Sequence, residues 1–198
     1  MQMPGLEVGF VMRRLMIACT ATAAAVILWA SACVTLAAVA DASLGQVKFT
    51  AKQSEAALEG SFTRFSADID LDPVHPQSGK INVAIDLASV EAGGTDANNL
   101  LKGRDFFDVT RFPRATFAST SVLATGAGTY QASGPFTLKG HTRQLVIDFI
   151  ARADRTGLWF EGSAPISRLA FGVGEGQWSD VSTLDDEVQI QFKVYVRR

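Results

Sequence analysis

Alternation of apolar and polar residues is the feature that most constrains this chain, because it recurs in five separate stretches. In one of the clearest, Ile81, Val83 and Ile85 alternate with polar or small neighbours such as Asn82. Successive side chains of a β-strand point to opposite faces, so each stretch predicts a strand with one buried face. The five stretches are residues 65–71, 81–87, 130–138, 145–151 and 188–196.

Three shorter stretches raise the expected number of strands to eight. They lie at residues 47–53, 115–123 and 158–167, and turn-forming pairs such as Lys139-Gly140 separate most of the neighbouring strands. Short links favour antiparallel neighbours in an up-and-down order. The only segment with predicted helical turns is 95–107, between the third and fourth strands.

The fold that this pattern favours is all-β, an eight-stranded antiparallel up-and-down barrel. Closure of the sheet removes the two edges that an open sheet would leave free to pair with other chains. A barrel of eight strands is either filled by its own side chains or holds one small ligand. Alternation alone does not distinguish these two interiors, because a packed core and a cavity wall have the same residue pattern.

The first forty residues predict an export signal. Arg13 and Arg14 precede an uncharged, Ala-rich stretch that ends at Ala40, and residues 38–40 (AVA) fit the small-x-small cleavage rule. The apolar stretch is also long enough to span a bilayer as an uncleaved anchor. We therefore expect a periplasmic domain at residues 41–198, either released by cleavage or anchored to the membrane and facing the periplasm.

Composition excludes several classes of function. Both cysteines, Cys19 and Cys33, lie in the predicted leader, so the exported domain would hold no disulfide. A formal charge of −2 gives no basic patch for nucleic acid. The only histidines, His75 and His141, lie in predicted turns with no cysteine nearby, and no nucleophile, base and acid are arranged for catalysis. We therefore predict no metal site, no catalytic residue and no enzymatic activity.

Several phrases in a fixed order carry a family resemblance. They are EGSFTRFSADIDLDP at 59–73, INVAIDLASVEAG at 81–93, RDFFDVTRFPRATFAS at 104–119, FTLKG at 136–140 and ISRLAFGVGEGQW at 166–178. Together they resemble the YceI-like family of exported polyisoprenoid-binding proteins, over roughly residues 45–196. The resemblance implies a lipocalin-like barrel with an elongated apolar cavity for a polyisoprenoid or an isoprenoid quinone. It favours a cavity over a filled core and implies no cofactor other than the bound lipid.

The inward-facing positions then become the expected cavity lining, with residues 104–117 as a cap over one end. Three polar residues are candidates to meet the head group of the lipid: Gln53, Arg143 and Arg168. The expected lining consists of Phe49, Phe65, Ile69, Ile81, Val83, Ile85, Leu87, Phe106, Phe107, Phe117, Phe136, Leu138, Leu145, Ile147, Phe149, Phe160, Phe171, Trp178, Ile190 and Phe192.

Three functions are compatible with these expectations. The first is a non-enzymatic carrier or store for an isoprenoid lipid in the periplasm, which would touch the membrane transiently. The second is an accessory domain that presents quinone to a membrane b-type cytochrome, and the third is an enzyme acting on lipid, against which the absence of a catalytic set argues. The sequence leaves the oligomeric state open, a dimer included.

Overall fold

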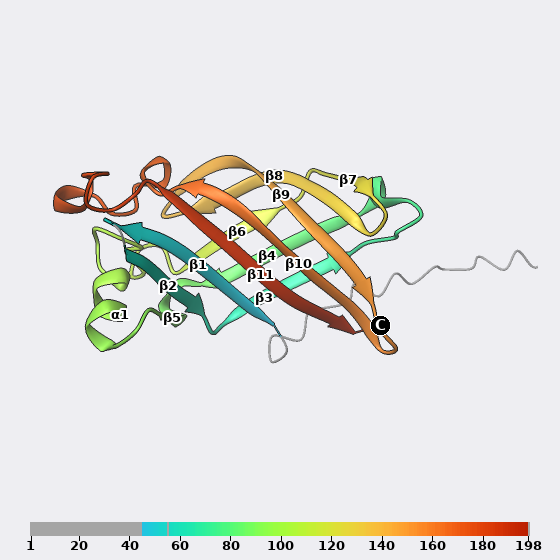
Figure 1. The fold of residues 1–198 in the computed structure, drawn as a ribbon, viewed down its shortest axis with the longest axis horizontal. Helices are drawn as coiled ribbons and strands as arrows, with labels where there is room; N and C mark the ends of the chain where they lie inside the picture. Colours follow the sequence, from blue (N-terminus) through green and yellow to red (C-terminus); the bar gives the residue numbers. More distant parts are fainter. Residues whose placement is uncertain (1–44, 55, 198) are drawn as a thin grey trace, which may run out of the picture. The chain divides into compact units, whose positions relative to one another are not determined.

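The computed structural model describes residues 45–54 and 56–197 of the 198-residue chain, so the predicted leader at 1–40 lies outside the described residues. Within them the chain forms eleven strands and one α-helix, α1 (Thr95–Lys102) (Figure 1). None of the helices in this part is long and apolar enough to cross a membrane. The strands are β1 (Gln46–Gln53), β2 (Ala56–Phe62), β3 (Phe65–Asp70), β4 (Lys80–Asp86), β5 (Val90–Glu91), β6 (Arg114–Ala118), β7 (Ser121–Gly126), β8 (Thr129–Leu138), β9 (His141–Ala153), β10 (Gly157–Ser167) and β11 (Glu187–Arg197).

The strands form one antiparallel sheet that closes on itself. Hydrogen-bonded neighbours follow the order β3-β4-β6-β8-β9-β10-β11-β1-β2-β5. The two ends of this order meet, because β2 continues along the chain into β3 and β4 continues into β5. Across these two breaks, Thr63 N donates to Ser89 O at 3.2 Å and Asp86 N donates to Arg64 O at 3.0 Å. The all-β barrel predicted from alternation is therefore confirmed.

The eleven strands correspond to the eight that were predicted, because three long strands are interrupted. The breaks fall at residues 63–64, at the short 3₁₀ helix Leu87–Ser89 and at residues 119–120, and β6 and β7 both pair with β8. The prediction missed β2, because its first four residues are exposed and show no apolar alternation. The helical segment was predicted at 95–107, and α1 fills its first part.

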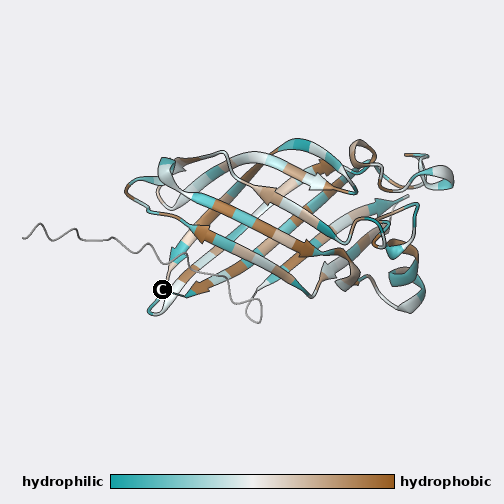
Figure 2. Ribbon diagram, turned by 180° about the vertical axis from the view of Figure 1, so that it is seen from behind, coloured by the Kyte–Doolittle hydropathy of each residue, from teal (hydrophilic) through white to brown (hydrophobic). Residues whose placement is uncertain are grey.

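Strand β8 shows why the alternation was a reliable guide. Its residues alternate between half-buried and buried along the whole strand, and the buried ones include Tyr130, Phe136 and Leu138. Figure 2 shows the corresponding change between hydrophobic and hydrophilic positions along the strands. A Cβ on Gly134 would collide with the carbonyl group of Ala118, so glycine allows β8 to approach the chain where β6 gives way to β7.

Candidate ligand-binding cavity

The interior of the barrel contains two adjoining apolar cavities. The larger, about 290 Å³, lies at the end where α1 and the loop of residues 168–186 are found. The smaller, about 80 Å³, lies further along the barrel and is lined by apolar atoms only. They adjoin because both are bordered by the same five residues, namely Val47, Ile85, Ala115, Phe136 and Ile190.

The structure places nineteen of the twenty expected lining residues around these cavities. Phe49, Ile85, Leu87, Phe106, Phe107, Phe136, Leu138, Trp178 and Ile190 line the larger one. Phe65, Ile69, Ile81, Val83, Phe117, Leu145, Ile147, Phe149, Phe160 and Phe192 line the smaller one. The exception, Phe171, is buried in the loop of residues 168–186 and packs edge-on against the Phe136 ring, with ring centroids 5.3 Å apart.

Several lining residues were missed by the sequence analysis. Leu58 comes from β2, and Ala97, Leu100 and Leu101 come from α1. The helix has a mostly polar sequence, TDANNLLK, and the adjacent leucines are its one signal of an apolar contact. Leu58 and Leu100 are 41% and 43% exposed, so the larger cavity has an apolar rim at this end.

The Phe-rich corner of residues 104–117 contributes Phe106 and Phe107 to the lining of the larger cavity. Phe107 packs against Phe62 with ring centroids 5.8 Å apart, and Phe62 packs in turn against Phe49 at 5.6 Å. Phe106 contacts the ring of Trp178 at 5.6 Å. These contacts connect the corner with strands β1 and β2 and with the loop of residues 168–186.

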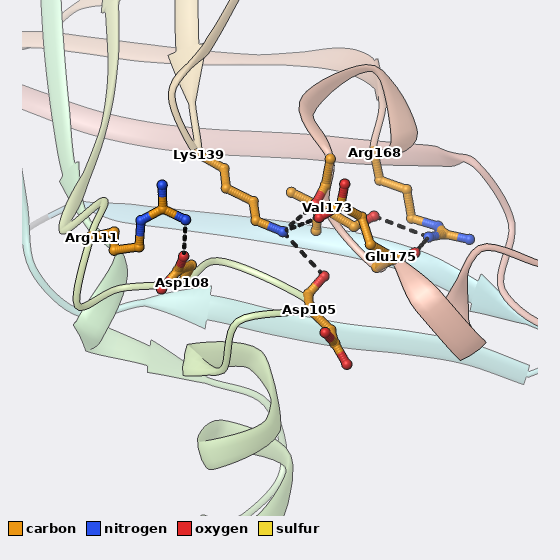
Figure 3. A network of polar contacts seen from close by, with 9 residues as sticks. Asp105, Asp108, Arg111, Lys139, Arg168, Val173 and Glu175 are labelled. Carbon is orange, nitrogen blue, oxygen red and sulfur yellow. Dashed lines mark hydrogen bonds and ion pairs between the residues drawn. The ribbon is translucent and has the colours of Figure 1, made fainter.

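Lys139 connects the Phe-rich corner to the loop of residues 168–186 by hydrogen bonds. It lies in the turn between β8 and β9, is only 7% exposed, and donates from Nζ to the Asp105 and Gly172 carbonyls and to Glu175 Oε2, the last at 2.9 Å (Figure 3). Asp105 O also accepts from the backbone N–H groups of Gly174 and Glu175, at 2.8 and 3.0 Å. The hydrogen bond from Lys139 and its positive charge lower the pKa of the Glu175 carboxyl.

Arg168 organises the loop itself. Its side chain is buried, and its guanidinium donates to the backbone carbonyls of five residues at 2.7–3.0 Å: Val173, Gly174, Trp178, Leu184 and Asp185. Burial lowers the pKa of the guanidinium. Arg168 borders the larger cavity, but its donors are directed at backbone carbonyls, so the structure gives it a scaffolding role.

The other two head-group candidates differ in position. Arg143 is exposed, lines neither cavity and donates to the carbonyl of Thr142 at 2.9 Å. Gln53 ends β1, lines the larger cavity and forms an isolated antiparallel bridge with Leu184. Of the three predicted candidates, Gln53 therefore has the position that suits contact with a ligand.

The fold and the cavity define a lipocalin-like barrel that encloses an apolar space. The chain belongs to the YceI-like family, since the model of the YceI-like domain matches residues 39–196. The crystal structure of BcnA from Burkholderia cenocepacia is similar, with 34% identity and a TM-score of 0.77, covering 79% of this chain and 98% of BcnA. The family resemblance noted in the sequence is thus confirmed.

Two further proteins are similar over most of the domain. A polyisoprenoid binding domain from Saccharophagus degradans shares the fold, with a TM-score of 0.63 and 16% identity over 81% of this chain and 98% of that domain. A UPF0312 protein of Pseudomonas savastanoi pv. phaseolicola is 30% identical over 135 residues, which cover 65% of this chain and 70% of the relative.

Proposed function

We propose that this protein binds an isoprenoid lipid in the barrel and carries or stores it in the periplasm without transforming it. The observation that carries the proposal is the pair of adjoining apolar cavities inside a closed barrel. An isoprenoid tail gains about 25 cal/mol for each Å² of apolar surface removed from water. A sugar or nucleotide would lose its hydrogen bonds to water and find few partners in such a lining.

The rim of the larger cavity supports a lipid as the ligand. The apolar side chains of Leu58 and Leu100 are partly exposed at the α1 end, where they would contact a tail as it enters from a membrane. The family membership and the shared fold with a polyisoprenoid binding domain point to the same class of ligand. The periplasmic location rests on the export signal predicted at residues 1–40.

The proposal is tested with the full chain, including its leader, expressed in bacteria. We expect the protein in the periplasmic fraction, with an isoprenoid lipid recovered by solvent extraction and identified by mass spectrometry. We also expect the purified protein to bind an added prenylated benzoquinone. If no isoprenoid lipid is extracted and no quinone binds, the proposed function is wrong.

A matched pair of variants on β6 tests whether the ligand binds inside the cavity. Ala115 is buried at the boundary of the two cavities, whereas Ala118 on the same strand is exposed. Ala115→Leu adds volume inside the barrel and should weaken quinone binding by about tenfold or more, which is about 1.4 kcal/mol. Ala118→Leu should bind like the unchanged protein. Circular dichroism verifies that both variants fold.

A further inference from the structure

Trp178, in the wall of the larger cavity, has a side-chain hydrogen-bond donor without a partner among the described residues. Trp178 lines this cavity, and its indole Nε1 is buried without a hydrogen bond to any described residue. The indole N–H can donate but cannot accept. A buried donor left without a partner is energetically unfavourable, so Nε1 is a candidate to donate to an acceptor from outside the chain.

Trp178 is held in this place by contacts from other parts of the fold. It ends the short 3₁₀ helix Gly176–Trp178, and its backbone carbonyl accepts from Arg168 Nη2 at 2.8 Å. Its ring packs against Phe106 of the Phe-rich corner at a centroid distance of 5.6 Å. The backbone of Trp178 is therefore held by a buried cation, and its indole ring packs against an aromatic neighbour.

Gln53 adds a second polar side chain to the lining of the larger cavity. The Nη2 atom of Arg168 donates to the carbonyl of Leu184 at 2.7 Å as well as to that of Trp178, and Leu184 forms the bridge with Gln53. The side-chain amide of Gln53 makes no hydrogen bond to a described residue. Gln53 and Trp178 both line the larger cavity, so an amide and an indole border the same space.

The charges around this region favour a neutral partner. The guanidinium of Arg168 is directed at backbone carbonyls, and the other charged lining residues, Lys48 and Glu59, are exposed and opposite in sign. No buried cation among the described residues is therefore left to pair with a phosphate. A carbonyl oxygen needs only a neutral donor, which the indole supplies.

We propose that the indole N–H of Trp178, assisted by the amide of Gln53, binds a neutral oxygen acceptor on the head group of the lipid. The assignment rests on the proposed function and adds its polar contact. The head group then lies at the α1 end, and the tail runs towards the smaller cavity, whose lining is entirely apolar. Trp178 thereby determines which lipids with equally long tails bind best.

The test uses two ligands that differ in their oxygen content. The first is a prenylated benzoquinone, and the second is squalene, an isoprenoid hydrocarbon without any acceptor. Trp178→Phe keeps an aromatic ring but removes the N–H group, and should weaken quinone binding about five- to tenfold while squalene binding changes less than about twofold. Trp159→Phe is the matched control, because Trp159 lines neither cavity.

A spectroscopic measurement gives a second readout. In ¹⁵N-labelled protein, the Trp178→Phe variant identifies the indole N–H signal of Trp178. This signal should shift on addition of the quinone, because the N–H group forms a new hydrogen bond. Squalene should not produce that shift.

The outcomes separate the assignment from the proposed function. If Trp178→Phe weakens the binding of both ligands equally, or of neither, the indole N–H has no role in recognition and the assignment is overturned. If the unchanged protein binds neither quinone nor squalene, the proposed function falls and the assignment falls with it.

Discussion

The two cavities of this barrel differ in how their walls are built. The smaller cavity is surrounded by strand residues that point inward, and it presents no polar atom. The larger cavity takes much of its wall from α1, the corner at 104–117 and the loop at 168–186, and it includes Gln53, Arg168 and Trp178. The comparison teaches that the strands supply a general apolar enclosure, whereas the irregular segments add Arg168 and Trp178 to the wall, and the indole of Trp178 is the group that we propose distinguishes one ligand from another.

The two ends also satisfy their backbone polar groups differently. Around the smaller cavity, the carbonyl groups pair in the antiparallel ladders, such as that between β3 and β4. At the other end, carbonyl groups of the loop at 168–186 accept from the buried side chains of Arg168 and Lys139. Buried carbonyl groups outside secondary structure need such donors, which makes this end depend on two cations.

The largest effect is expected where the two cavities meet. Phe136→Ala should lower the free energy of unfolding by about 3–5 kcal/mol, because it removes a buried ring. It should also join the cavities, so that the affinity for squalene rises relative to that for farnesene, a hydrocarbon half as long. Chemical denaturation and hydrocarbon binding measure the two effects.

The control for this prediction is Phe171→Ala. Phe171 packs against Phe136 but lines neither cavity, so its loss should reduce stability without changing the preference for tail length. An equal change of preference in both variants would show that the barrel has merely loosened. In that case Phe136 would not separate two distinct spaces.

A smaller and more local effect is expected from Arg168→Met. The substitution leaves five backbone carbonyls without their donor and should destabilise the loop at 168–186 by about 3 kcal/mol. Hydrogen exchange should accelerate in this loop while β3 and β4 stay protected. Arg143→Met, at an exposed arginine, should change little. Uniform loss of protection across the barrel would contradict the view that the two ends are separately stabilised.

The smallest effect concerns pH and the contact between Glu175 and Lys139. The pKa of Glu175 is lowered from its usual 4.5. The contact therefore stabilises the fold fully above pH 4.5, and this stabilisation is lost as the pH falls through the lowered pKa of the folded protein. The Glu175 side chain is 60% exposed, so the contribution is at most about 1 kcal/mol. The difference in melting temperature between the unchanged protein and Glu175→Gln should therefore shrink between pH 6 and pH 3. A difference that stays constant over this range would show that the ion pair contributes nothing.

The melting temperature of the Glu175→Gln variant should still fall as the pH is lowered. Asp72, Asp154 and Asp180 also have lowered pKa values, and each accepts hydrogen bonds from groups close to it in the sequence or, for Asp154, also from Tyr195. Their protonation destabilises both proteins alike. Only the difference between the two curves reports on the contact with Lys139.

Particular elements show how far the sequence could be read. The stretch at 130–138 predicted β8 almost residue for residue, because alternation survives wherever one face of a strand is buried and the other is not. The sequence analysis missed strand β2 because its first four residues are exposed and show no apolar alternation. Arg168 was predicted to contact the head group. Its neighbours in the sequence give no sign that five backbone carbonyls further along the chain surround its guanidinium.

The sequence by itself determined the strand walls, the inward-facing set of apolar residues and the family. These follow from a local period of two residues and from phrases in a fixed order, so no knowledge of distant neighbours is needed. The tertiary structure alone decided how the interior divides into two cavities, how Lys139 and Arg168 hold the α1 end, and that Nε1 of Trp178 lacks a partner among the described residues. The physical reason is that these features depend on contacts between residues far apart in the chain, which only closure of the barrel brings together.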